Sequence, residues 1–185
     1  MNQALLIIDA QQELMDGNEK EKAVFKKEQL IRNINLVINK ARKSNVPIVF
    51  VRDLDVAEGK GEGFEIHHGI SIPQEVKIFD KKATNCFHGT ELLNHLRSQE
   101  IKHVVMMGCS TQHCIDSAVR TATISGLDVT LVGDGHSTVD SDVLSAEHII
   151  KHHNHTLHGH YNVDHFSVVR DSEEDLFQPT HDSYR

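Results

Sequence analysis

Short runs of apolar, mostly β-branched residues alternate along the chain with segments in which apolar positions recur at helical spacing. The short runs predict buried strands at residues 4–8 (ALLII), 46–51 (VPIVFV), 103–107 (HVVMM), 128–132 (DVTLV) and 165–169 (HFSVV). Helical spacing occurs within residues 30–41, 92–96, 115–122 and 143–150. Strands that alternate with helices favour βαβ crossovers, which predict a three-layer α/β/α sandwich around a mostly parallel, doubly wound sheet.

We expect a single domain over residues 1–185. The length and the 38% hydrophobic content suffice for one core, and no internal repeat or linker divides the chain. The stretch 53–72 holds four of the eleven glycines and little periodicity, which predicts a long loop of the kind that covers a site. The acidic, polar tail 172–185 is expected to be loosely ordered or to reach another subunit.

Composition narrows the class of partner. The formal net charge is −8 and no Lys/Arg cluster is present, which argues against nucleic acid or an anionic membrane surface and favours small molecules. No apolar stretch approaches the roughly 18 residues of a membrane span, and three cysteines without a CxxC pair indicate a reducing compartment. We therefore expect a soluble, cytoplasmic protein with free thiols.

Histidine is abundant, with 15 residues in the chain, several of them crowded into residues 148–165. His148 and His152 have the i, i+4 spacing at which two imidazoles on a helix can share a metal ion. No carboxylate or cysteine completes a recognisable ligand set, so a polar helix face is the favoured interpretation and neither a metal nor a cofactor is expected. A histidine-rich metal-handling protein remains an alternative.

The stretch "GCSTQHCIDSAVRTA", residues 108–122, joins a predicted strand to a predicted helix. Cys114 falls in the first helical turn, with Ser110 or Thr111 as the N-cap, where the helix dipole and free N–H groups favour a thiolate and can bind an oxyanion. A nucleophile and a merely packed cysteine are both compatible with this position. Cys109 comes directly off the strand and is predicted to be packed.

Two further places carry candidate chemistry. Asp9 follows the first strand at its carboxyl end, where ligands bind in such sheets, so it is a candidate base; a helix cap or turn aspartate is the alternative. Lys81 and Lys82 follow the apolar pair Ile78 and Phe79. A lysine there could stabilise a thiolate and a developing oxyanion, although adjacent lysines are usually solvated surface.

Taken together, these segments resemble the isochorismatase-like cysteine hydrolase superfamily, which includes nicotinamidases, carbamoyl-amide hydrolases, ureidoacrylate hydrolases and streptothricin hydrolases. "LLIIDAQQEL" resembles the first strand with its Asp-x-Gln, and "IFDKKATNCFHGTELLNHL" resembles the lysine, Ser-Ala-Phe and Gly-Thr segment. "VVMMGCSTQHCIDSAVRTATISGLDVTLVGDGHST" resembles the nucleophile segment and the strand after it. The resemblance covers nearly the whole chain.

This resemblance implies a triad of Asp9, Lys81 and Cys114. Lys81 is preferred over Lys82 because the family's lysine stands six residues before the phenylalanine of Ser-Ala-Phe, which matches Phe87. The implied mechanism is hydrolysis of a C–N bond in an amide, carbamoyl or lactam group through a Cys114 thioester, with Asp9 as base and Lys81 as electrostatic support.

The same resemblance places an unusual cis peptide between Cys109 and Ser110, and it implies an oxyanion hole formed by the N–H groups of Ser110 and Cys114. Gln11, Phe87, Thr111 and His113 are the implied substrate-binding residues. Family members commonly assemble as dimers or tetramers, so a homodimer or homotetramer is expected, with a small amide-like substrate as the partner.

Two departures from the family pattern affect the expected activity. Asn85-Cys86-Phe87 replaces Ser-Ala-Phe, which is expected to alter the pocket wall. The Asp-x-His pair of nicotinamidase-type metal sites is replaced by Asp53, Leu54 and Asp55, although His67 and His68 lie downstream. Cys114 itself favours C–N hydrolysis over the enol-ether cleavage of isochorismatases; a non-catalytic binding protein, an isochorismatase and a nicotinamidase are the alternatives.

Overall fold

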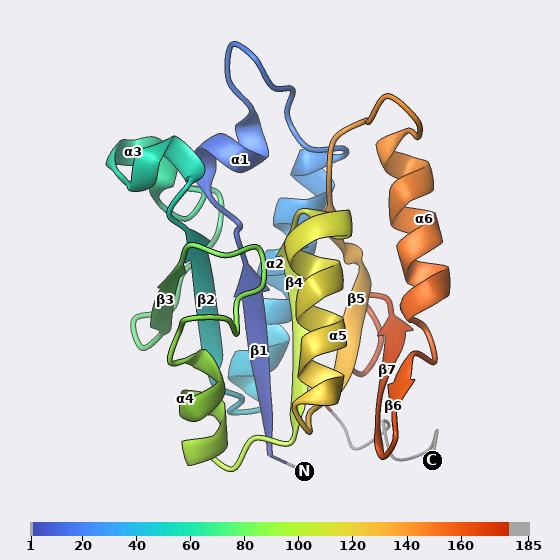
Figure 1. The fold of residues 1–185 in the computed structure, drawn as a ribbon. Coiled ribbons are helices and arrows are strands. Elements are labelled where there is room, and N and C mark those ends of the chain that lie inside the picture. The colour runs from blue at the N-terminus through green and yellow to red at the C-terminus, as the bar shows by residue number, and fades with distance from the viewer. Residues whose placement is uncertain (1, 178–185) are drawn as a thin grey trace.

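The computed structural model describes residues 2–177 and consists of one sheet with helices on both of its faces (Figure 1). The strands are β1 (Gln3–Ile8), β2 (Ile48–Asp53), β3 (Lys77–Lys81), β4 (His103–Cys109), β5 (Asp128–Ser137), β6 (Tyr161–Asn162) and β7 (His165–Arg170). Their order across the sheet is β3-β2-β1-β4-β5-β7-β6, and every pairing is parallel except that of β6 with β7. The predicted α/β sandwich with a mostly parallel sheet is confirmed.

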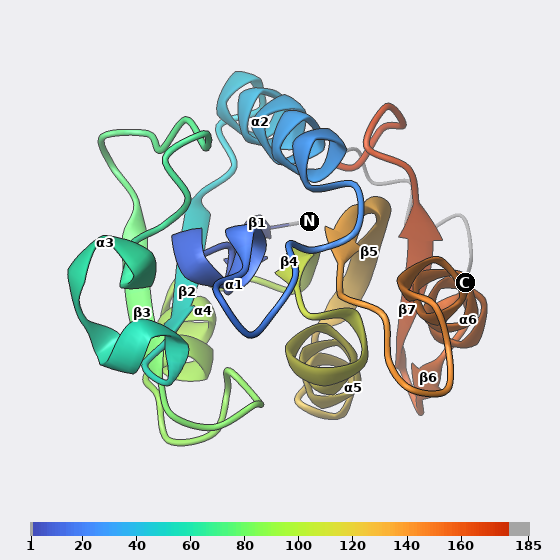
Figure 2. The same cartoon turned by 90° about the horizontal axis from the view of Figure 1, so that it is seen from above.

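Alternate residues of the central strand serve two separate cores. Leu5 and Ile7 of β1 belong to the cluster that contains the apolar side of α2 (Lys27–Lys43), whereas Leu6 and Ile8 belong to the cluster that contains α5 (Asp116–Ile124). Period-two alternation in a strand covered on both sides requires both sets to be apolar, which explains the unbroken hydrophobic run. Seen from above, α2 covers one face, and α4 (Leu92–Ser98), α5 and α6 (Ala146–Leu157) cover the other (Figure 2).

Several local expectations need correction. β3 and β6 are strands that the sequence does not predict, because three of the five residues of β3 are charged and β6 has two residues. The helical spacing predicts Val143 and Leu144 on the last helix, but that helix begins after Ser145, whose hydroxyl accepts a hydrogen bond from the His148 N–H. The side chains of Val143 and Leu144 are both exposed. None of the helices in residues 2–177 combines the length and the apolarity that a bilayer crossing requires.

The expected long loop at 53–72 contains a 3₁₀ turn at Val56–Gly59 and the short helix α3 (Gly61–Phe64). Together with α1 (Gln12–Asp16), this segment lies beyond the carboxyl ends of β1 and β2 (Figures 1 and 2). In the tail, Ser172 and Leu176 are buried, and Leu176 joins the core cluster of α2, whereas residues 173–175 between them are exposed. Residues 178–185 of the expected tail lie outside the described residues.

The chain reverses its direction across the sheet at the boundary between β1 and β4. From β1 it moves outward to β2 and β3, then returns to β4 on the other side of β1 and moves on to β5 and β7. Parallel sheets bind ligands at such a switch point, beyond the carboxyl ends of the strands. Gly108 lies there with φ +126°, and a Cβ would stand 1.9 Å from the Ile8 carbonyl oxygen, so close contact between β1 and β4 requires glycine.

Candidate active site

Four strands deliver one functional residue each to the same point. Asp9 follows β1, Asp53 ends β2, Lys81 ends β3, and Cys114 lies in the turn after β4. The Lys81 ammonium is 3.0 Å from Asp9 Oδ2 and 3.5 Å from Cys114 Sγ, and it also bonds Asp53 Oδ2. Asp9 and Lys81 are almost fully buried, at 0% and 1% exposure. The structure thus brings Asp9, Lys81 and Cys114 together, whereas Lys82 is exposed.

Asp53 is a member of this cluster that sequence reasoning missed. The signal was its position at the carboxyl end of the second strand, where a carboxylate faces the same edge as Asp9. Gln11 fixes this strand end: its side-chain amide donates to the Asp53 carbonyl (3.1 Å) and its oxygen accepts from the Asp53 N–H (2.7 Å). The same amide donates to the Phe64 carbonyl (2.8 Å), so Gln11 ties α3 and β2 to β1.

Burial and neighbouring charges set the ionisation of Asp9 and Lys81. Burial raises the pKa of Asp9 to about 6, and the positive charge of Lys81 opposes part of that rise. Burial alone would lower the pKa of Lys81, but Asp9 and Asp53 more than compensate and raise it above its ordinary value. Near neutral pH, Asp9 is therefore an ionised carboxylate with enough basicity to accept a proton, and Lys81 is a fixed cation.

The expected low pKa of Cys114 is wrong. Burial raises the pKa of this thiol to about 12, together with the negative charge and hydrogen bonding of Asp9, and the opposing effect of Lys81 is smaller. The resting sulfur is a thiol, so a thiolate forms only when the proton passes to Asp9. Burial likewise raises the pKa of Cys86 and of Cys109, and both are fully buried in the cores. The expected packed role of Cys109 is confirmed.

The turn that carries Cys114 is a π-helical turn, Thr111–Ile115, capped by Ser110 and followed directly by α5. Ser110 is the N-cap by position, without a side-chain hydrogen bond to the turn. The peptide between Cys109 and Ser110 is cis, as expected.

The buried His136 holds the side chain of Thr111 in place. Its hydroxyl lies 2.9 Å from His136 Nδ1, and His136 Nε2 lies 2.8 Å from Asn154 Oδ1 on α6. The Asn154 amide nitrogen donates to the Gly133 carbonyl, which turns Oδ1 toward the imidazole. Burial lowers the pKa of His136 to about 4, so the ring is neutral, and it accepts from Thr111 and donates to Asn154.

A cavity of about 390 Å³ opens onto the sulfur. Its lining includes Asp9, Asp53, Ser110, His113 and Cys114. Of the expected substrate-binding residues, His113 lines this cavity. Gln11 and Thr111 are fully buried behind it with their side chains engaged as described, and Phe87 packs in the core cluster that also contains Cys114.

The same cluster is the one place in residues 2–177 where at least three potential metal-ligand atoms converge, those of Asp9, Asp53 and Cys114. The Lys81 ammonium already contacts all three side chains, so a divalent cation would meet a fixed positive charge. His67 Nε2 is 3.2 Å from Asp16 and its Nδ1 accepts from the Gly69 N–H, while His68 contacts Gln12. The residues at this end of the sheet therefore do not fit a nicotinamidase-type metal site.

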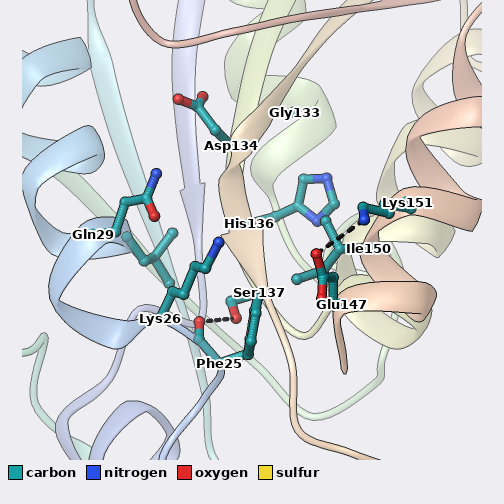
Figure 3. Close-up of a pocket in the computed structure, with 11 residues that line it drawn as sticks. Phe25, Lys26, Gln29, Gly133, Asp134, His136, Ser137, Glu147, Ile150 and Lys151 are labelled. Atoms are coloured by element: carbon teal, nitrogen blue, oxygen red, sulfur yellow. Dashed lines mark hydrogen bonds and ion pairs between the residues drawn. The ribbon is translucent and has the colours of Figure 1, made fainter. Parts of the chain in front are cut away.

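A second hollow of about 170 Å³ lies between the start of α2 and α6 (Figure 3). Its lining includes Lys26, His136, Glu147 and Lys151, and Figure 3 shows the His136 ring turned from β5 toward α6. Both ring nitrogens are engaged, and Glu147 pairs with Lys151 at 2.9 Å. The hollow does not reach the thiol. On α6, His148 contacts Ser145 and His153 contacts the Ile149 carbonyl.

Comparisons with known proteins show the family of the chain. The sequence profile of the isochorismatase domain matches residues 3–156. The uncharacterized isochorismatase family protein YddQ of Bacillus subtilis (strain 168) is 26% identical over 161 residues, covering 80% of this chain and 87% of the relative.

Two solved structures share the fold. One is N-carbamoylsarcosine amidase from Thermoplasma acidophilum, with a TM-score of 0.75 and 22% identity over 95% of this chain and 99% of that one. The other is pyrazinamidase of Pyrococcus horikoshii in complex with zinc, with a TM-score of 0.72 and 20% identity over 92% and 99%. Because the family profile matches most of its length, the chain belongs to the isochorismatase family of hydrolases.

Proposed function

We propose that the protein hydrolyses a C–N bond of a small amide, carbamoyl or lactam compound through a thioester on Cys114. The observation that carries the proposal is the buried ammonium of Lys81, which contacts both the Asp9 carboxylate and the Cys114 sulfur at the floor of a cavity. Nucleophile, base and electrostatic support are thus within contact of one another before substrate binds. The amidase and pyrazinamidase that share the fold are named for amide substrates, which is consistent with this reaction.

Acylation begins with proton transfer from the Cys114 thiol to Asp9, as the sulfur attacks the substrate carbonyl carbon. A thiolate beside an ionised Asp9 would place two negative charges together in a buried site, so the transfer keeps the total charge of the pair constant. Lys81 stabilises the anion on either partner, because its ammonium contacts both. The proton on Asp9 then passes to the leaving nitrogen, the C–N bond breaks, and ammonia or an amine departs.

The carbonyl oxygen becomes negative during the attack. In the proposed mechanism, the N–H groups of Ser110 and Cys114 donate to it. Both residues line the cavity, and the π-helical turn holds Cys114 four residues beyond Ser110. The Thr111 contact with His136 supports that turn.

Deacylation uses the same base. A water molecule gives a proton to Asp9 as its oxygen attacks the thioester carbonyl; the C–S bond breaks, the acid leaves, and Asp9 returns the proton to the sulfur. A pKa near 6 suits a group that accepts and gives back a proton twice in each turnover near neutral pH.

The test is Cys114→Ala against Cys86→Ala, assayed with a panel of small carboxamides, carbamoyl compounds and lactams. Cys86 is the matched control because it is another buried thiol of the same core cluster. We expect Cys114→Ala to lose hydrolysis and Cys86→Ala to keep it, and we expect an acyl adduct on the Cys114 peptide in rapidly quenched wild-type reactions. Hydrolysis that survives in Cys114→Ala, or a wild-type enzyme that cleaves no compound and forms no adduct, would contradict the proposal.

A further inference from the structure

The cavity over Cys114 is lined by negative charge. Five carboxylate residues line it, Asp9, Glu13, Glu21, Asp53 and Asp55, and no lysine or arginine is among the lining residues. Two of the five, Asp9 and Asp53, share the single ammonium of Lys81 at the floor. The other three are called the rim carboxylates below; Glu21 and Asp55 are exposed and Glu13 is half-buried.

The rim carboxylates come from three separate segments. Glu13 lies on α1, Glu21 lies in the connection between α1 and α2, and Asp55 follows β2. None of the ion pairs among residues 2–177 involves Glu13, Glu21 or Asp55. Glu13 accepts one hydrogen bond, from the neutral Asn18 amide at 3.1 Å. Like charges that converge on one concavity without counterions create a negative potential there.

The floor of the cavity is already compensated. Asp9 is fully buried and lines the cavity, but its Oδ2 lies 3.0 Å from the Lys81 ammonium and its carboxylate hydrogen-bonds the Cys114 thiol. The charge that lacks a counterion is therefore that of the rim carboxylates.

We propose that the substrate is an organic cation, in which a protonated amine or a guanidinium group beside the rim carboxylates accompanies the amide-like carbonyl at Cys114. This inference rests on the proposed function. A volume of about 390 Å³ is enough for such a small molecule. A metal ion is disfavoured at the floor, because Lys81 contacts the three convergent ligand side chains there.

The charge also bears on turnover. A cationic substrate is attracted to the cavity, whereas the acid released by deacylation carries a new carboxylate that the same residues repel. Substrates whose distant end is anionic meet that repulsion on entry. The negative charge of the cavity thus favours binding of cationic substrates and assists release of the acid product.

The first experiment reads the charge at Cys114 without hydrolysis. Cys114 is labelled with two methanethiosulfonates of similar size, one carrying a trimethylammonium group and one a sulfonate, and each rate is divided by the rate with free cysteine. We expect the cationic reagent to be favoured at least tenfold at low salt, with the ratio falling as salt rises. Peptide mass spectrometry assigns the label. We expect it on Cys114, which lines the cavity, because Cys86 and Cys109 are both 0% exposed.

The matched variants remove two charges each. Glu21→Gln/Asp55→Asn removes two rim carboxylates, and Glu75→Gln/Glu100→Gln removes two exposed ones that do not line the cavity. If each exposed charge changes the labelling ratio by about twofold, removing both rim carboxylates is expected to lower that ratio about fourfold. The control pair is expected to leave the ratio unchanged. Equal effects of both pairs, or a wild-type ratio near one or below it, would overturn the inference.

The second experiment compares hydrolysis of matched amides that carry a trimethylammonium, a tert-butyl or a carboxylate group at the same position. The inference is supported if kcat/KM is highest for the cationic amide, intermediate for the neutral one and lowest for the anionic one, and if Glu21→Gln/Asp55→Asn loses the preference for the cationic amide. Charge-selective labelling without hydrolysis of any amide would refute the proposed reaction and leave the cation-selective cavity standing. Micromolar Zn²⁺ or Mg²⁺ that protects wild-type Cys114 from label, but not the rim pair, would replace the organic cation with a metal and overturn the inference.

Discussion

Replacing Asp9 with asparagine is expected to abolish hydrolysis and, at neutral pH, to make the protein more stable. Burial raises the pKa of Asp9 to about 6 from an ordinary value of 3.8, so ionising this group costs more in the folded protein than in the unfolded chain. At 1.36 kcal/mol per pKa unit, the cost is about 3 kcal/mol at pH 7. Asparagine has the shape of the neutral acid, tolerates the left-handed backbone of this position (φ 51°), and carries no charge to bury.

The sign of the pH dependence follows from the raised pKa. The folded protein binds the Asp9 proton more tightly than the unfolded chain, so the stabilisation is fully present below pH 3.8 and is lost as pH rises through 6. The excess stability of Asp9→Asn is therefore expected to be about 3 kcal/mol at pH 7 and about half of that at pH 5. Subtracting wild type from variant at each pH cancels every group that titrates alike in both proteins.

Urea unfolding followed by far-UV circular dichroism between pH 5 and 8 measures this difference; the chain has no tryptophan for a fluorescence readout. Asp16→Asn is the control of opposite sign. Although burial opposes it, hydrogen bonds from Lys27, His67 and Gln12 lower the pKa of Asp16 to about 2, so the stabilisation by its ionised form is present throughout this range and is lost only as pH falls below 3.8. Asp16→Asn is thus expected to be less stable than wild type at every pH from 5 to 8, the opposite sign to Asp9→Asn.

The result that would refute the reasoning is an Asp9→Asn variant that is no more stable than wild type at pH 7, or whose stability difference does not shrink toward pH 5. Either outcome would mean that the surroundings of Asp9 compensate its charge fully. The carboxylate would then lack the raised basicity that the proposed proton transfers require.

The remaining predictions concern the base and the lysine. Because Asp9 must be ionised to accept the thiol proton, kcat/KM is expected to fall about tenfold per pH unit below pH 6 and to stay level from pH 7 to 9; a limb that instead follows a thiol near pH 8.5 would contradict the assignment. Lys81→Met leaves Asp9 and Asp53 without their cation and is expected to lose about 3–5 kcal/mol of unfolding free energy at pH 7, whereas the exposed Lys82→Met should stay within about 0.5 kcal/mol. Equal urea midpoints for the two variants would show that Lys81 is not the buried partner.

Much of the site was predictable because its residues follow strand ends. Asp9 stands directly after a hydrophobic run, Cys114 lies in the first helical turn after another, and the resemblance to the family places Lys81 by its spacing from Phe87. Asp53 was missed because its neighbours continue into a polar loop, so nothing in the local pattern shows that its strand lies between β1 and β3. Gln11 and Thr111 were expected in the pocket, but their hydrogen bonds go to Asp53, Phe64 and His136, which are distant in sequence.

The sequence by itself determined the layered α/β architecture, since unbroken apolar runs demand a sheet covered on both faces and helical periods supply the covers. It also determined the order of the reactive residue types along the chain. Only the tertiary structure decided the ionisation of these residues and the sign of the charge that lines the cavity. The reason is that a pKa depends on burial and on every neighbouring charge, and here those neighbours come from four strands. A helix terminus favours a thiolate locally, but burial and Asp9 reverse that preference at Cys114.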